Sequence, residues 1–215
     1  MNSFNTPSNI MLILGQRMDA ILSINPKVDG APEVEGNCQW ATIEAAKVLL
    51  NNEYKPCPLK DFPADIDEAD PIEKYLDDPS LDVRHCHNFS ELNDAMKTLK
   101  DGELLIVNGD AEISHAYLIL NKNKNYWLMD ADRGIYKKIS SEEDLIEKNI
   151  PGWVKDNPDG DSLDYLNMRF ADSPETDEYS EFETYKLSAK DFNLLPNPHP
   201  QKKHKQDSSL DKNKP

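Results

Sequence analysis

The sequence has few cysteines, little positive charge and no long apolar run, and each shortage argues against a class of protein. Three cysteines, Cys38, Cys57 and Cys86, are too few for a disulfide framework and fit a reducing compartment. Lysine and arginine number 24 against 40 aspartates and glutamates, which gives a net charge of -16. Because phosphates and anionic lipid headgroups bind basic surfaces, this charge argues against nucleic acid and against a membrane surface as the main partner.

The N-terminal residues lack the features of an export signal. The stretch MNSFNTPSNIMLILGQRM has no basic start, and its apolar run IMLIL is too short for a secretory signal peptide. No window approaches the length of a membrane span. We therefore expect a protein that is made in the cytoplasm without an N-terminal signal peptide, and a delivery route that needs no such signal stays open.

The hydrophobic pattern predicts helices first and an antiparallel meander afterwards, which favours an α+β fold over a doubly wound sheet. The predicted helices are 9–24 with an interruption at Gly15, 38–50, a short one around 72–76, 90–102 with Ser90 as its cap, and one that begins at Ser140. The predicted strands are a short one within 81–89, then 103–107, 114–120, 125–131, 134–139 and 182–188. NGD at 108–110 is typical of a turn.

These elements are assigned to one domain that covers 1–195. Its core spans about 30–145, and two acidic stretches, 55–80 and 155–182, are predicted to be surface insertions. The segment 196–215 is rich in proline, lysine and glutamine, so we predict a disordered basic tail.

The stretch EGNCQWATIEAA, 35–46, places Cys38 at the predicted start of a helix. A thiol becomes a good nucleophile only as a thiolate, which a helix N-terminus and a neighbouring imidazole both stabilise. The backbone N–H groups at such a helix start are also available to an oxyanion, and Asn37 or Gln39 could add a side-chain donor. A cysteine before a helix is more often a core residue, so this hypothesis requires a histidine partner.

His115 is the strongest partner because it begins an apolar strand, SHAYLIL, where a polar ring needs a reason to be present. If 121–124 form a four-residue loop, the hairpin pairs His115 with Asp130 on one face of the sheet. Asp132 has the same parity and is the alternate carboxylate, whereas a five-residue loop would turn Asp130 to the other face. We therefore predict Cys38 as nucleophile, His115 as general base and acid, and Asp130 as the group that orients the imidazole.

This order of features resembles the papain-like cysteine peptidases. The resemblance rests on GNC followed by a helix, a helix leading into the ELLIV strand, a strand that starts with His115, and a following strand that ends in Asp130. It covers about 30–145 and is similar to compact bacterial branches: effector and toxin proteases, glutamine deamidases, and the peptidase domains of peptide-exporting transporters. The stretch HAYLILNKNKNYWLMDADRGIYKKIS is similar in rhythm to the last of these.

Two details qualify the resemblance. EGNC is also similar to the DGNC of ovarian-tumour-type deubiquitinases, although the separate downstream strand with its aspartate fits papain-like topology better. Papain-like enzymes commonly have an oxyanion glutamine several residues before the cysteine, and the preceding segment here, DGAPEVEGN, has none.

The resemblance implies a papain-like fold in which N-terminal helices pack on an antiparallel β-sheet. It implies a hydrolase or acyl transferase that acts on amide bonds of a protein substrate through a Cys-His-Asp catalytic triad and needs no cofactor. A thiol protease (cysteine protease), a protein-glutamine deamidase and a transglutaminase all pass through the same acyl-enzyme, so the triad leaves the choice open. Together with the small size and the acidic insertions, the resemblance leads us to expect a secreted virulence effector that modifies a host protein.

A second hypothesis from a different class stays open. The same fold could be a catalytically inactive binding module whose acidic surface docks a basic protein partner. Thiol reactivity distinguishes the two hypotheses, because only the enzyme requires Cys38 to react faster than the other cysteines.

No metal site is predicted. His85 and His87 share one face of a strand and could both touch an ion, but no second ligand pair at metal-binding spacing exists. A calcium loop in DNPDGDSLD, 156–164, fails because the required glycine alignment puts Lys155 and Leu166 at ligand positions. The remaining histidines, His199 and His204, fall in the predicted tail.

Overall fold

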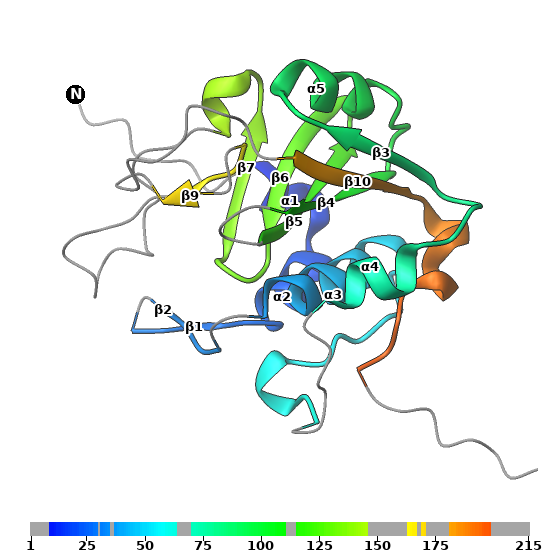
Figure 1. Ribbon diagram of the computed structural model, residues 1–215. Helices are drawn as coiled ribbons and strands as arrows, with labels where there is room; N and C mark the ends of the chain where they lie inside the picture. The colour runs from blue at the N-terminus through cyan, green and yellow to red at the C-terminus, as the bar shows by residue number, and fades with distance from the viewer. Residues whose placement is uncertain are drawn as a thin grey trace, which may run out of the picture.

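The protein is a mixed α+β structure built around one antiparallel β-sheet (Figure 1). The computed structural model describes residues 9–29, 31–34, 37–63, 70–110, 115–145, 163–166, 169–170 and 181–198. The sheet has six strands in the order β3-β10-β4-β5-β6-β7, and every neighbouring pair is antiparallel. The strand bounds are β3 (Asp82–Cys86), β4 (Leu104–Asp110), β5 (His115–Lys122), β6 (Asn125–Asp130), β7 (Ile135–Ile139) and β10 (Glu181–Leu187).

Helices cover both faces of this sheet (Figure 1). One face carries α1 (Asn9–Leu14), α2 (Gln16–Leu22), α3 (Cys38–Leu50) and α4 (Pro71–Leu76), and the other face carries α5 (Phe89–Lys97). Every residue of α3 after Cys38 is buried, so α3 is the central helix of its layer. Helix α5 is amphipathic and buries only Leu92, Ala95 and Met96.

The alternation of side chains along β5 separates the two cores. Ala116, Leu118 and Leu120 pack toward α3, while Tyr117 and Ile119 pack toward α5. A strand that is buried on both faces has a continuous apolar run, which explains why AYLIL carries no polar residue. His115 begins this strand and is therefore held between two packed layers.

Four of the five predicted helices are present in the described residues, and some of their ends differ from the prediction. The helix expected over 9–24 breaks where Gly15 takes a φ of 51°, as the sequence indicated. Helix α5 is capped by Asn88 rather than Ser90, because the Asn88 side chain accepts a hydrogen bond from the Glu91 N–H at 3.0 Å. Where a helix was expected from Ser140, the described residues up to Leu145 form a 3-10 turn, Glu142–Asp144.

Several segments predicted to be loops are partly regular. NGD at 108–110 continues β4 instead of turning, because β10 pairs with it along its whole length. The segment 25–36, which lies between the predicted helices 9–24 and 38–50, contains a small hairpin of β1 (Lys27–Val28) and β2 (Ala31–Pro32). Within 155–182, β8 (Leu163–Asp164) pairs with β9 (Arg169–Phe170). The 3-10 turns are Leu59–Asp61 and Ala189–Leu194, and most of the predicted tail lies outside the described residues.

Candidate active site

Cys38 is the first residue of α3 and is partly exposed. Asn37 occupies the cap position, and its carbonyl accepts the hydrogen bond of the Ala41 N–H at 2.9 Å. The N–H groups of a first helical turn have no partner within the helix, so this end of α3 carries partial positive charge. A thiolate at Cys38 therefore lies where the helix stabilises negative charge.

Helix α3 is joined directly to the strand that carries His115. The hydroxyl of Thr42, four residues after Cys38, donates a hydrogen bond to the carbonyl of Ala116 at 3.0 Å in a buried environment. Residues four apart lie on one face of a helix, so Cys38 and Thr42 face the same strand. This contact holds Cys38 beside His115. The Cys38 thiol and the His115 imidazole form a hydrogen bond.

His115 and Asp130 form a buried pair at the ends of β5 and β6. The Nε2 atom of His115 lies 2.8 Å from Oδ2 of Asp130, with the side chains 4% and 0% exposed. Because Nε2 faces the carboxylate, Nδ1 is the ring nitrogen left for the Cys38 thiol. The three predicted residues thus form one chain of contacts, thiol to imidazole to carboxylate.

Two further donors hold the Asp130 carboxylate. The backbone N–H of Arg133 donates to Oδ1 at 2.9 Å, and the hydroxyl of Tyr165 donates to Oδ2 at 2.9 Å. A buried carboxylate is costly unless its oxygens accept hydrogen bonds, and here both do. Tyr165 also packs against the His115 ring, with 6.1 Å between the ring centroids.

The electrostatic surroundings favour the charged forms of this pair. Burial by itself lowers the pKa of His115, but the charge of Asp130, its hydrogen bond and the contact with Cys38 outweigh it and raise that pKa to about 9. Burial raises the pKa of Asp130, and the opposite charge and hydrogen bond of His115, with a smaller effect of Arg133, bring it below the usual value. Near neutral pH the site therefore holds an imidazolium and a carboxylate.

The hairpin that brings His115 to Asp130 has a different register from the predicted one. Asn123 and Lys124 form a two-residue turn with φ angles of 53° and 60°, and Lys122 pairs with Asn125. Continuing this register places Asp130 opposite Tyr117, one step of two residues from direct opposition to His115. The four-residue loop was therefore wrong, but a shift of two residues keeps the face, so the pair forms diagonally.

Asp132, the alternate carboxylate, is not the partner of His115. Its Oδ1 and its carbonyl accept hydrogen bonds from Asn25 Nδ2 at 3.2 and 3.1 Å. Burial and the nearby Asp130 charge raise the pKa of Asp132 to about 6. Asn25 also bonds both backbone groups of Val34, at 2.8 and 3.0 Å, and so ties the segment before Cys38 to the end of β6.

Gln39, suggested as an oxyanion donor, instead supports α4. Its Nε2 donates to Asp70 Oδ1 at 3.2 Å, and its Oε1 accepts the N–H of Ile72 at 2.9 Å. Both ends of the amide are thus occupied at the start of α4. Asn37 makes no capping hydrogen bond with its side chain. The backbone N–H groups at the start of α3 and the Asn37 side chain are the candidate oxyanion donors.

Sequence reasoning missed Tyr165 and Thr42. Tyr165 lies in the acidic stretch 155–182, where no periodicity distinguishes it from a solvated loop, yet it is 1% exposed. Thr42 is polar at a buried position of an otherwise apolar helix face, which was the one signal that it had a buried partner.

The other histidines lie away from this site or outside the described residues. His85 Nδ1 lies 3.1 Å from Glu181 Oε1, at an exposed edge of the sheet, and His199 and His204 fall in the undescribed segment. Among the residues that the structure describes, no group of three His, Cys, Asp or Glu side chains is placed to hold a metal ion.

Comparisons of the chain with protein-family models, with curated proteins and with solved structures found no match. Across the described residues, no helix is long and apolar enough to cross a membrane. The geometry of Cys38, His115 and Asp130 is therefore the basis on which a function can be assigned.

Proposed function

We propose that this protein is a cysteine-dependent hydrolase or acyl transferase of papain-like fold that acts on amide bonds of a protein substrate, as a thiol protease or a protein-glutamine deamidase. The observation that carries the proposal is the contact chain from the Cys38 thiol through His115 to the buried Asp130. Cys38 lies at the start of α3, and α3 packs on an antiparallel sheet. This arrangement supports the papain-like assignment.

The geometry supports a thiolate–imidazolium mechanism. With His115 protonated, the Cys38 thiolate attacks the amide carbon, and the oxyanion that forms faces the N–H groups at the start of α3. His115 then donates its proton to the leaving nitrogen as the carbon–nitrogen bond breaks, which leaves a thioester on Cys38. Asp130 keeps the imidazole oriented and stabilises its positive charge throughout.

The fate of the thioester defines the reaction class. If His115 takes a proton from water, hydroxide adds to the thioester, the carbon–sulfur bond breaks and the free thiol is restored. That product is a cleaved peptide when the attacked amide lies in a backbone, and a glutamate when it is a glutamine side chain. A lysine amine in place of water gives a transglutaminase. Delivery into a host cell as an effector stays a prediction.

Residue-resolved alkylation tests the proposal. Intact protein is treated with iodoacetamide across a pH series, and the extent of labelling at Cys38, Cys57 and Cys86 is read by peptide mass spectrometry. Burial raises the pKa of Cys57 and of Cys86, so both should react slowly near neutral pH. We expect Cys38 to react selectively at pH 7 and below.

Two variants give the experiment its control. His115→Ala should remove the selective labelling of Cys38, whereas His85→Ala, which removes an exposed imidazole on the edge strand β3, should leave it unchanged. Equal, ordinary reactivity of all three cysteines would make Cys38 a structural residue. The binding-module hypothesis would then replace the enzyme.

A further inference from the structure

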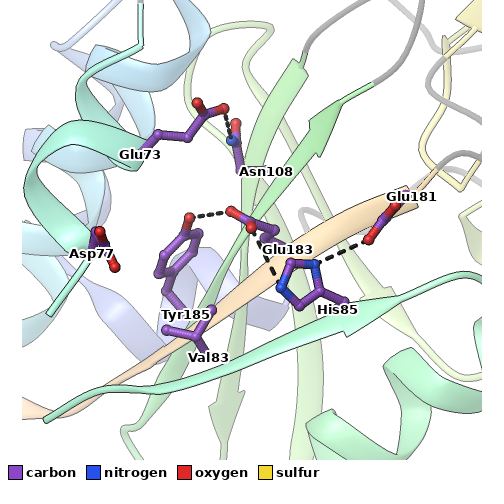
Figure 2. Close-up of a pocket in the computed structure, with 8 residues that line it drawn as sticks. All are labelled: Glu73, Asp77, Val83, His85, Asn108, Glu181, Glu183 and Tyr185. Atoms are coloured by element: carbon purple, nitrogen blue, oxygen red, sulfur yellow. Dashed lines mark hydrogen bonds and ion pairs between the residues drawn. The ribbon is translucent and has the colours of Figure 1, made fainter. Parts of the chain in front are cut away.

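A pocket of ≈ 550 Å³ opens on the α3 side of the sheet, between α4 and the strands β3 and β10 (Figure 2). Four carboxylates line it: Glu73 and Asp77 from α4, and Glu181 and Glu183 from β10. None of its lining residues is a lysine or an arginine. The charge of this pocket is therefore strongly negative, and it suits a cationic occupant.

One side chain in the pocket wall needs a donor that the described part of the protein does not supply. Asn108 is 3% exposed, and its Nδ2 donates to Glu73 Oε1 at 3.3 Å (Figure 2). Its Oδ1 accepts no hydrogen bond from the described residues. A buried acceptor without a donor is unfavourable, so an N–H group entering the pocket would be stabilised there.

The remaining walls suit an aliphatic stem. Val83 and the ring of Tyr185 line the pocket, and Tyr185 donates its hydroxyl to Glu183 (Figure 2). Burial and the carboxylates of Glu183, Glu73 and Asp77 raise the pKa of Tyr185, so its ring faces the pocket as a neutral phenol. Lysine and arginine combine an apolar stem with a head that only donates hydrogen bonds, which matches both kinds of wall.

A bare metal ion fits this pocket less well than a basic side chain. Among the described residues, no three His, Cys, Asp or Glu side chains converge closely enough to hold a metal, so these carboxylates surround a volume instead of a point. His85 spans the outer side, with Nδ1 3.1 Å from Glu181 Oε1 and Nε2 3.6 Å from Glu183 Oε1 (Figure 2).

The pocket is joined to the catalytic residues on two sides. Asn108 pairs with Ala116 and the next residue, Gly109, pairs with His115, so the backbone of the pocket wall is one residue from the backbone of His115, whose ring packs with Tyr165 on the other face of the sheet. On the other side, Gln39 follows Cys38 and holds the start of α4, which carries Glu73. A peptide whose amide reaches Cys38 would therefore place a nearby side chain over the pocket.

From these contacts we infer that the pocket between α4 and β10 is a specificity subsite that binds a lysine or arginine side chain of the substrate, close in sequence to the amide that Cys38 attacks. The inference rests on the proposed function, and it adds the substrate class: a basic segment of a protein. The occupant interacts through the carboxylates of Glu73, Asp77, Glu181 and Glu183 and through Asn108. Its stem lies against Tyr185 and Val83.

The first test measures substrate-like labelling of Cys38. Peptidyl acyloxymethyl ketones are prepared in pairs that differ only by arginine or its neutral isostere citrulline, with that residue moved through each position before the ketone. At its best position, arginine should raise the second-order rate of Cys38 modification by about tenfold or more, because a hydrogen bond to a charged group commonly contributes that much.

Variants locate the effect in the pocket. Glu73→Gln with Asp77→Asn should remove most of the arginine preference, and Glu181→Gln, a change at a half-exposed rim position, should reduce it even if the double variant folds poorly. The matched control, Asp19→Asn with Glu53→Gln, removes the same charge from exposed positions outside the pocket lining and should change nothing.

The rate at which iodoacetamide labels Cys38 in the same variants separates the specificity subsite from the proposed function. Selective iodoacetamide labelling of Cys38 without an arginine preference would overturn the subsite and leave the proposed function standing. Loss of the arginine preference in the pocket variants, at an unchanged iodoacetamide rate, supports the subsite as a binding effect.

A second measurement tests the pocket without chemistry. Nα-acetyl-arginine amide is titrated into the Cys38→Ala full chain, with Nα-acetyl-citrulline amide as control, and amide chemical shifts are followed by NMR. Shifts in α4 and β10 with the arginine compound alone support the pocket even if Cys38 proves unreactive. Equal shifts with both compounds, or none, would overturn it.

Discussion

The Nε2 atom of His115 lies 2.8 Å from Oδ2 of Asp130 although the two residues are not directly opposed in the β5–β6 hairpin. The register places Asp130 one two-residue step away, on the same face of the sheet. The imidazole reaches the carboxylate diagonally, and this leaves the other ring nitrogen toward Cys38. The ionisation of His115 is thus controlled by two side chains at once.

We expect His115 to titrate with a pKa of about 9 in the folded protein, because the Asp130 charge and hydrogen bond outweigh burial. In Asp130→Asn this opposing charge is absent, so burial should take the pKa of His115 below its usual value of about 6.5. NMR of ¹⁵N-labelled histidine measures both values. An unchanged pKa in Asp130→Asn would contradict this account of the site.

The same pKa predicts a pH dependence of stability. Since the folded pKa of His115 is raised above the unfolded value of about 6.5, its contribution is complete below that pH and is lost as pH rises through about 9. Urea unfolding should give a free energy of unfolding that falls across this window. The fall should be smaller in His115→Gln, and a rise in the wild-type protein would show that the pair does not stabilise the fold.

Tyr165→Phe should remove one hydrogen bond from the Asp130 carboxylate while keeping the ring that packs on His115. The lost hydrogen bond to Asp130 Oδ2 is expected to cost about 1 kcal/mol of stability and to raise the pKa of Asp130, which NMR titration of the carboxyl group measures. Tyr117→Phe is the matched control, because the Tyr117 hydroxyl donates to the Tyr165 carbonyl at 3.3 Å instead. Equal effects of both variants on the Asp130 titration would argue that Tyr165 acts only by packing.

Gln39→Ala should destabilise the protein without reducing the reactivity of Cys38. The change removes the acceptor of the buried Ile72 N–H and the link to Asp70, which should cost about 1–3 kcal/mol in urea unfolding. The iodoacetamide rate at Cys38 should stay the same, since Gln39 contacts α4 and not His115. A stable variant with a slow Cys38 would return Gln39 to a role in catalysis.

Lys47→Met tests a buried charge pair on the far part of α3. The Nζ of Lys47 lies 3.3 Å from Glu44 Oε1, with both side chains almost fully buried. Removing the lysine leaves the Glu44 carboxylate unpaired, so we expect a loss of about 3–5 kcal/mol by urea unfolding. Combining Lys47→Met with Glu44→Gln should recover part of this loss, because the amide still accepts from Tyr54 and the Cys57 N–H. If the free energy of unfolding falls no more than when an exposed lysine is replaced, Lys47 and Glu44 do not stabilise each other.

The sequence alone was sufficient to predict that Cys38, His115 and Asp130 lie together as a candidate site, because each stands out against its local pattern. A cysteine at a helix start, a histidine that begins an apolar strand, and an aspartate at the end of the next strand are local signals. The face shared by His115 and Asp130 was also predictable, since face depends only on parity and survived a register error of two residues.

Only the tertiary structure showed what surrounds these residues. Tyr165 reaches Asp130 from a segment with no periodic pattern, and Asn25 reaches Asp132 across 107 residues of chain, so neither contact has a local signal. β10 lies between β3 and β4 although it follows both in the chain, and this non-local pairing builds the acidic pocket. Local chemistry can be read along the chain, whereas contacts between distant segments depend on how complete elements pack.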